Sequence, residues 1–341
     1  MSASLPSDTR RRPVLVITGG SSGIGRCTAA LFARRGWDVG LIARGRNGLE
    51  SAQEEVRQGG ARTAIAEADV SDSAALEQAA TAIEAELGPI DAWVNCAGVS
   101  SYGRFMDVPE EDYERVTRVT YLGVVNGTRV ALKRMLPRNR GNIVNVGSAV
   151  ALRAVPMQSA YSAAKHAVAG FTEALRAELV EARSAVQLGI VHPPSTNTPF
   201  FSHAASHLPE GGVPRPPPPI YAPEITADAI HLAVTQNRRS VQVGGQTAMF
   251  GVANTVMPGA LDWLLGHLGT TATQVTNSER IAAQRDETLH RPSLRASPVH
   301  GPFGGETLGH SVQMALSRNP TLCVGLGVAA LAFLTSRLTR R

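Results

Sequence analysis

Short apolar runs alternate with helical stretches along the first two thirds of this 341-residue chain. The runs are rich in β-branched residues and lack the polar alternation of a half-exposed strand, which is typical of strands buried on both faces of a parallel sheet. An unbroken strand–helix alternation predicts an α/β fold, a Rossmann-like doubly wound sheet with helices on both faces. The expected strands are residues 14–18, 39–43, 63–66, 92–95, 142–146 and 186–191, and the expected helices are residues 24–35, 49–58, 73–86, 110–135 and 161–181.

The chain changes character after this alternation. A helix at 224–236 and a strand at 240–243 complete the pattern, so a single dinucleotide-binding domain is expected over residues 13–245. Residues 1–12 are polar and basic and are predicted to be disordered. Residues 246–318 are predicted to form a C-terminal helical and irregular extension. Within it an apolar stretch precedes a polar, poorly periodic part that is expected to be loosely ordered.

Residues 319–336 form an apolar stretch without a charge, flanked by Arg318 and Arg337. As a helix it would extend about 27 Å, close to the hydrocarbon thickness of a bilayer. Three interpretations stay open: a C-terminal membrane anchor, a core or dimer-interface helix, or a surface helix. We expect a cytoplasmic protein, with membrane association through this tail as one of the alternatives.

Composition narrows the classes of partner. The net charge is +5 and aromatic residues make up 5% of the chain, with no run of five or more basic residues, so no nucleic-acid partner is expected. The three cysteines, Cys27, Cys96 and Cys323, are widely separated. They show neither a disulfide framework nor metal-ligand spacing, so no metal site is predicted.

A glycine-rich turn follows the first strand and precedes the first helix. Glycine there lets the backbone turn sharply and approach a pyrophosphate, and the helix start offers free N–H groups and the positive end of a dipole. The turn therefore predicts a dinucleotide site. Its cofactor-binding residues are expected to be Gly19, Ser21, Ser22, Gly23, Ile24 and Gly25.

The residue after the second strand predicts which dinucleotide binds. An acidic side chain there would accept a hydrogen bond from the adenosine 2′-hydroxyl and favour NAD. This chain has Arg44, with Arg46 close by. A guanidinium can hold a 2′-phosphate through two hydrogen bonds, so NADP(H) is expected in preference to NAD(H).

Ser148, Tyr161 and Lys165 are the candidate catalytic residues. Tyr161 and Lys165 are four residues apart on one predicted helix, so both project from the same face. A tyrosine hydroxyl can act as a proton donor if a nearby ammonium stabilises its anion. Ser148, after the fifth strand, can hydrogen-bond the same substrate oxygen.

These motifs, taken in order, resemble the short-chain dehydrogenase/reductase family in its single-domain branch. Thr18, Gly19, Gly23 and Gly25 match the family's cofactor turn, and Tyr161 with Lys165 matches its Tyr-x-x-x-Lys motif. The resemblance covers about residues 13–245. It implies that further cofactor contacts come from Asp69, Val70, Asn95, Ala97, Gly98, Pro193 and Thr198, together with Tyr161 and Lys165.

Two positions depart from the family pattern. Thr120 stands where the resemblance leads us to expect a fourth catalytic residue, an asparagine that supports a water in the proton relay. We predict that Thr120 takes this position, with a rearranged relay because it has only a hydroxyl. Pro194 replaces a glycine and stiffens the backbone near the nicotinamide.

The resemblance implies an NADPH-dependent oxidoreductase, a carbonyl reductase or alcohol dehydrogenase with Tyr161 as its acid/base. Hydride would move between nicotinamide C4 and a carbonyl or alcohol carbon. The segment 195–221, with Val150 and Val155, is expected to wall an apolar substrate pocket, and together with the apolar tail it favours a lipophilic substrate. A homodimer or homotetramer is expected from the resemblance. The alternative is a catalytically weak redox sensor or scaffold that keeps the nucleotide site; an epimerase or dehydratase fits the glycine spacing less well.

Overall fold

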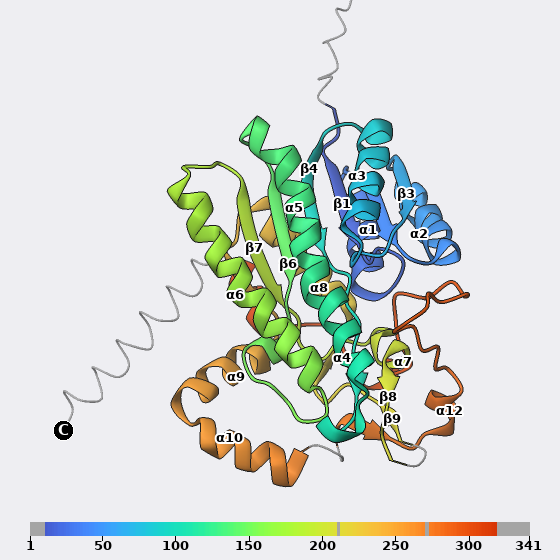
Figure 1. Ribbon diagram of the computed structural model, residues 1–341, viewed down its shortest axis with the longest axis vertical. Coiled ribbons are helices and arrows are strands. Elements are labelled where there is room, and N and C mark those ends of the chain that lie inside the picture. The colour runs from blue at the N-terminus through green and yellow to red at the C-terminus, as the bar shows by residue number, and fades with distance from the viewer. Residues whose placement is uncertain (1–10, 210–211, 270–272, 319–341) are drawn as a thin grey trace, which may run out of the picture.

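A seven-stranded sheet forms the centre of the molecule (Figure 1), in a computed structural model that describes residues 11–209, 212–269 and 273–318. Every neighbouring pair of its strands is parallel. The predicted doubly wound α/β fold is therefore confirmed. In spatial order the strands are β11 (Ser240–Gln242), β7 (Gln187–His192), β6 (Asn142–Val146), β4 (Ile90–Asn95), β1 (Val14–Thr18), β2 (Asp38–Ala43) and β3 (Thr63–Glu67).

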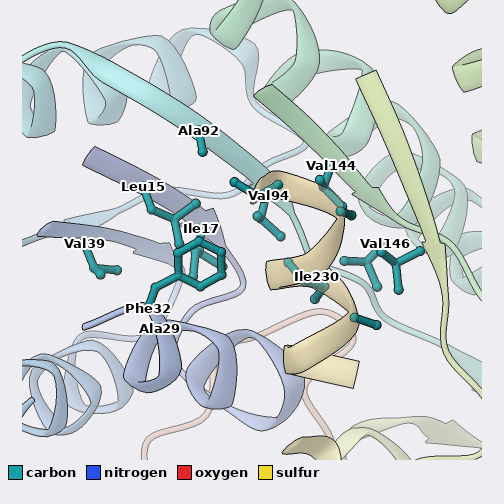
Figure 2. Packing of buried hydrophobic residues seen from close by; sticks show 14 of the residues in the cluster. Leu15, Ile17, Ala29, Phe32, Val39, Ala92, Val94, Val144, Val146 and Ile230 are labelled. Carbon is teal, nitrogen blue, oxygen red and sulfur yellow. The ribbon is translucent and has the colours of Figure 1, made fainter. Parts of the chain in front are cut away.

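Helices cover both faces of the sheet because the side chains of each strand alternate between them. Leu15 and Ile17 of β1 face one helical layer, and Val14 and Val16 face the other. Figure 2 shows the first layer, where Phe32 points toward the sheet and is fully buried. The first layer consists of α1 (Gly23–Arg34), α2 (Arg46–Gln58) and α8 (Pro223–Thr235), and the second of α3 (Ser73–Leu87), α5 (Gly123–Met135) and α6 (Ser159–Glu181).

The order of the strands creates a crevice between β1 and β4. From β1 the chain winds outward through β2 and β3, then crosses back to β4 on the other side of β1. Thr18 at the end of β1 is in register with Asn95 of β4 and Ile42 of β2. The turns that leave these strands therefore lie side by side, at the point where open parallel sheets bind ligands.

Local details differ from the sequence-based expectation at two helices. The helix expected over 110–135 is divided into α4 (Glu110–Thr117), a π-helical turn at Arg118–Leu122 and α5. α3 extends to Leu87, one residue beyond the expected range 73–86, and its N-cap is Asp72, whose carboxylate accepts from the amides of Ala74 and Ala75.

Residues 273–318 pack on the strand–helix units of residues 13–245, whereas the sequence predicts loose order there. Leu289 is fully buried, and Phe303 and Met314 are buried as well. This region consists of short elements whose partners are distant in the sequence, so no periodic pattern in the sequence predicts it. The remaining elements are β5 (Ser101–Tyr102), α7 (Phe200–His203), β8 (Ala205–Ser206), β9 (Val213–Pro214), β10 (Ile220–Tyr221), α9 (Gly245–Val256), α10 (Pro258–Leu264), β12 (Val275–Thr276), α12 (Glu279–Ala282), β13 (Thr307–Leu308) and α13 (Val312–Arg318).

The candidate membrane anchor at 319–336 lies outside the described residues. Among the helices that the structure does describe, none combines the length and the apolar character needed to cross a bilayer.

The contact between α5 and β4 requires glycine at position 127. A Cβ atom there would lie 2.0 Å from the Asn95 side-chain oxygen and 3.0 Å from Trp93 Nε1. Because this overlap forces a buried side chain to shift, Gly127→Ala should lower the free energy of unfolding by about 1–3 kcal/mol, measured by chemical denaturation.

The matched control is Gly170→Ala in α6, where a Cβ atom would meet nothing within 4 Å. This substitution should leave stability unchanged or raise it by about 0.5–1 kcal/mol, since alanine favours the helix. Equal denaturation midpoints for Gly127→Ala and the unmodified protein would contradict the close packing of α5 on β4.

Candidate active site

A cavity of about 290 Å³ opens at the carboxyl ends of the strands, in the crevice between β1 and β4. It collects residues from the turns after these strands, from α6 and from the C-terminal extension. Most of the residues expected to bind cofactor or substrate line this one space. These are Gly19, Ser21, Ser22, Gly23, Ile24, Gly25, Arg44, Asp69, Val70, Ala97, Gly98, Ser148, Tyr161, Lys165, Pro193 and Thr198.

The glycine turn is held directly against the backbone that follows β4. Gly19 has φ +72°, and a Cβ atom on it would lie 2.8 Å from the backbone of Ala97. A Cβ atom on Gly25 would lie 2.2 Å from the Gly19 carbonyl oxygen. The Thr18 hydroxyl accepts from the amides of Cys96 and Ala97 at 3.2 and 3.3 Å. A side chain at either position would overlap this backbone, so only glycine fits there. Backbone without side chains also lets a pyrophosphate approach closely.

The start of α1 fits a phosphate group. Its N-cap, Ser22, makes no side-chain hydrogen bond to the helix, and Ile24 and Gly25 of the first turn line the cavity. First-turn amides have no partner within the helix and lie at the positive end of its dipole. Gly23 already donates to the carbonyl oxygen of Pro298 at 3.2 Å. The remaining amides suit an anion.

At the end of the cavity beside β2 and β3, two arginines and an aspartate meet the C-terminal extension. Arg44 donates to the carbonyl oxygens of Thr288 and Leu289, and Arg115 also donates to Leu289, at 3.1 Å. Arg115 forms an ion pair with Asp69. Burial lowers the pKa of Arg44, and the neighbouring charge of Arg115 adds to this effect. Sequence reasoning missed Arg115, because its role depends on contacts with residues far along the chain.

The carboxylate of Asp69 stays ionised in this cluster. Burial alone would raise its pKa, but hydrogen bonds from Arg115 and Ser71 outweigh burial and hold the pKa below its ordinary value. The Ser71 amide and hydroxyl donate to one oxygen at 2.9 and 2.7 Å.

The three candidate catalytic side chains converge where β6 ends and α6 begins. Ser148 follows β6 and lies beside the Tyr161 hydroxyl, and its oxygen accepts from the amide of Val150 at 3.3 Å. Lys165 lies one helical turn beyond Tyr161, with its Nζ 5.6 Å from the centre of the tyrosine ring. The same Nζ donates to the carbonyl oxygen of Val146 at 2.7 Å, so the ammonium is fixed in place.

Burial shifts both titrating groups toward their neutral forms. It raises the pKa of Tyr161 above its ordinary value, although the hydrogen bond with Ser148 acts in the opposite direction. It lowers the pKa of Lys165 to about 8. Lys165 is 3% exposed, so water screens its charge poorly.

Asn95 and Thr120 do not line the cavity. Asn95 accepts a hydrogen bond from Trp93 at 2.7 Å and donates to Thr128 and Asn145, so its side chain ties β4 to α5 and β6. Its buried partners cannot be foreseen from the local sequence.

The hydroxyl of Thr120 donates to the Val99 carbonyl and accepts from the Val99 amide, at 2.9 and 3.0 Å. Thr120 therefore holds the loop after β4, within the π-helical turn that divides α4 from α5. A Cβ atom on Gly98 would lie 3.8 Å from both Thr120 Oγ1 and Lys165 Nζ. Thr120 thus lies near Lys165 but, unlike the lysine, does not line the cavity.

The part of the cavity in front of Tyr161 is largely apolar. Phe200 lies with its ring centre 5.2 Å from that of Tyr161. Leu208 and Ile220, which belong to the segment 195–221 expected to wall this pocket, do not line the cavity and pack in the cluster that contains Phe201 and Phe303. The apolar lining consists of Tyr102, Val150, Val155, Pro194, Phe200, Phe201, Pro217 and Phe250.

The comparisons with known proteins agree with this geometry. The family model described as short chain dehydrogenase matches residues 13–208. An uncharacterized oxidoreductase from Bacillus subtilis, YxnA, is 35% identical over 253 residues, which cover 74% of this chain and 71% of that protein. The chain therefore belongs to the short-chain dehydrogenase/reductase family and is an oxidoreductase of that type.

Two further similarities concern proteins with named reactions. The 3-ketodihydrosphingosine reductase of Bos taurus is 34% identical over 193 residues, covering 55% of this chain and 58% of that protein. The crystal structure of an actinorhodin polyketide ketoreductase variant with NADPH is 27% identical, with a TM-score of 0.61. That similarity covers 69% of this chain and 97% of the ketoreductase.

Replacing Lys165 by methionine tests the cost of burying its charge. Below about pH 8 the folded protein carries this charge in its interior, so Lys165→Met should be at least as stable as the unmodified protein at pH 7. An unfolded lysine has a pKa of about 10.4. Between the two pKa values the unfolded chain binds more protons, so the stability of the unmodified protein rises with pH.

The stability advantage of Lys165→Met should therefore shrink as the pH rises from about 8 toward 10, measured by urea denaturation at pH 7 and 9.5. A difference in unfolding free energy that is independent of pH would contradict the lowered pKa of Lys165.

Proposed function

We propose that this protein is an NADPH-dependent carbonyl reductase, or an alcohol dehydrogenase in the reverse direction. The observation that carries the proposal is the convergence of Ser148, Tyr161 and Lys165 at the inner end of a cavity whose other end is built for a dinucleotide. A nicotinamide cofactor supplies a hydride at C4 when bound, and the protein has to provide the proton and the orientation.

Tyr161 is the proposed acid/base. Its hydroxyl and that of Ser148 line the same cavity side by side, so both can donate to one substrate oxygen placed between them. As negative charge develops on that oxygen, Tyr161 gives up its proton. Lys165, held on Val146, stabilises the resulting tyrosinate and offers hydrogen bonds toward the cofactor ribose. Alcohol oxidation runs through the same groups with the proton moving toward Tyr161.

Charge at the far end of the cavity supports NADP(H). Arg44 lines the cavity there, and Asp69, the acidic residue of the lining, is already paired with Arg115, which lies behind it. A 2′-phosphate would therefore meet positive charge without an opposing free carboxylate. The similar polyketide ketoreductase was crystallised with NADPH, which agrees with this preference.

The substrate proposed is an apolar carbonyl compound or alcohol. The walls in front of Tyr161 are aromatic and aliphatic, and Val150 and Phe200 flank the space. The similarity to a reductase named for a long-chain sphingoid ketone favours the same chemical class. Assembly as a homodimer or homotetramer, the candidate anchor at 319–336 and a cytoplasmic location remain predictions.

Tyr161→Phe tests the chemistry. The variant keeps the ring but loses the proton donor, so it should bind NADPH as the unmodified protein does while turnover falls by a factor of about 10²–10⁴. Binding is measured by fluorescence titration with NADPH and NADH, with NADPH expected to bind more tightly. Turnover is measured as NADPH oxidation over a panel of aldehydes, ketones, quinones and lipid-like carbonyls.

The matched control is Tyr121→Phe. Tyr121 packs on Phe171 and does not line the cavity, so this variant should keep its turnover. Full turnover in Tyr161→Phe would place the acid/base elsewhere and overturn the proposed mechanism.

A further inference from the structure

The segment 286–301, called the strap below, crosses the adenosine half of the cavity. It comes from the extension beyond the family match, which ends at residue 208. In Figure 1 the orange-red chain after α12 reaches back toward the first strand–helix units. Five of its residues, Thr288, Pro292, Ser293, Arg295 and Ser297, line the same cavity as the glycine turn.

Hydrogen bonds hold the strap along its whole length. Its start is fixed to α7, where the amides of Asp286 and Thr288 donate to the carbonyls of Ser202 and His203 at 3.1 and 3.0 Å. Its end is fixed where the amide of Gly301 donates to Asn197 at 3.2 Å, one residue before Thr198.

The middle of the strap is fixed to the two helices that begin at the cofactor turn and the ribose turn. Asn47 of α2 donates to the carbonyl of Leu294 at 2.8 Å, and Arg26 of α1 donates to the carbonyl of Ser297 at 3.0 Å. Residues 294–297 therefore lie between α1 and α2, which places them over the position expected for the adenosine ribose.

The arginines next to the ribose turn already have partners. Two N–H groups of Arg44 donate hydrogen bonds to the strap carbonyls of Thr288 and Leu289. Arg46 pairs with Glu50 at 2.7 Å and with Glu67 at 3.5 Å. Much of the positive charge that the sequence places near the 2′ position is therefore committed before a phosphate arrives.

Arg295 is the cation of the strap that remains available. It lines the cavity, and its guanidinium forms no ion pair within residues 11–209, 212–269 and 273–318. Ser293, whose hydroxyl bonds to the Arg295 amide at 3.0 Å, lines the cavity beside it. Arg291 is also on the strap and exposed, but it does not line the cavity.

We propose that Arg295 is a specificity-determining residue for the cofactor, which binds the 2′-phosphate of NADP(H) from the strap side. Arg44 then acts partly as an anchor that positions the strap. This inference rests on the proposed NADP(H) preference. It also explains why the extension is packed on the first strand–helix units: the phosphate site is complete only when the strap is in place.

The test uses the full-length protein and the cofactor fragments adenosine 2′,5′-bisphosphate and 5′-AMP, which differ by the 2′-phosphate. Isothermal titration gives the Kd of each fragment for the unmodified protein, Arg295→Ala, Arg295→Lys and the control Arg291→Ala. A charge-assisted hydrogen bond of typical strength corresponds to a change of about tenfold or more in Kd.

Arg295→Ala should raise the Kd of adenosine 2′,5′-bisphosphate about tenfold and leave that of 5′-AMP nearly unchanged, with Arg295→Lys between Arg295→Ala and the unmodified protein. Arg291→Ala should change neither value. The proposal is overturned if Arg295→Ala leaves the bisphosphate Kd unaltered, or if it weakens both fragments equally. Failure of the NADP(H) preference itself looks different, because the unmodified protein would then bind the two fragments with similar Kd.

Discussion

The packing of the β1–α1 turn against the backbone after β4 is the contact on which the rest of the site depends. Gly19 lies so close to Ala97 that a Cβ atom on Gly19 would overlap the Ala97 backbone. The Thr18 hydroxyl accepts hydrogen bonds from the amides of Cys96 and Ala97 in the same segment. Because β1 and β4 are neighbours at the switch point of the sheet, this contact sets the floor of the cavity. This floor positions the start of α1, the loop held by Thr120 and the face of α6 that carries Tyr161.

The candidate active site contains two buried ionisable side chains, Lys165 and Tyr161. Lys165 is buried without an acidic partner among its hydrogen bonds in the described structure, donating instead to the carbonyl of Val146. Such burial is unfavourable for stability, but it also lets one ammonium act strongly on a neighbouring hydroxyl because the surroundings screen charge weakly. Tyr161 shows the complementary effect, since burial favours its protonated form until negative charge develops beside Lys165. In the proposed mechanism the pair therefore holds the proton until a substrate oxygen accepts it.

The central sheet could be predicted from the sequence because its signals are local, and the expected range 142–146 coincides with β6. Tyr161 and Lys165 are proposed as catalytic residues from their place in the ordered set of motifs, because their helical spacing alone is a common pattern. The strap could not be predicted, because its partners are distant: Arg44 and Leu289 are 245 residues apart. Asn95 shows the same limit, since its position fits a cofactor motif while its side chain is used by Trp93, Thr128 and Asn145. Periodicity and motifs locate elements, but hydrogen-bond partners depend on the completed fold.

Hydrogen–deuterium exchange with and without NADPH tests most directly whether this edge of the sheet is a cofactor site closed by the C-terminal extension. The account predicts slower amide exchange after NADPH is added in the peptides that contain residues 19–25, 44–47 and 288–298, because the ligand would lie between them. Peptides from α3, which belongs to the second helical layer and contributes no residue to the cavity lining, should exchange unchanged. Unaltered exchange in the glycine turn and the strap at saturating NADPH would contradict the account.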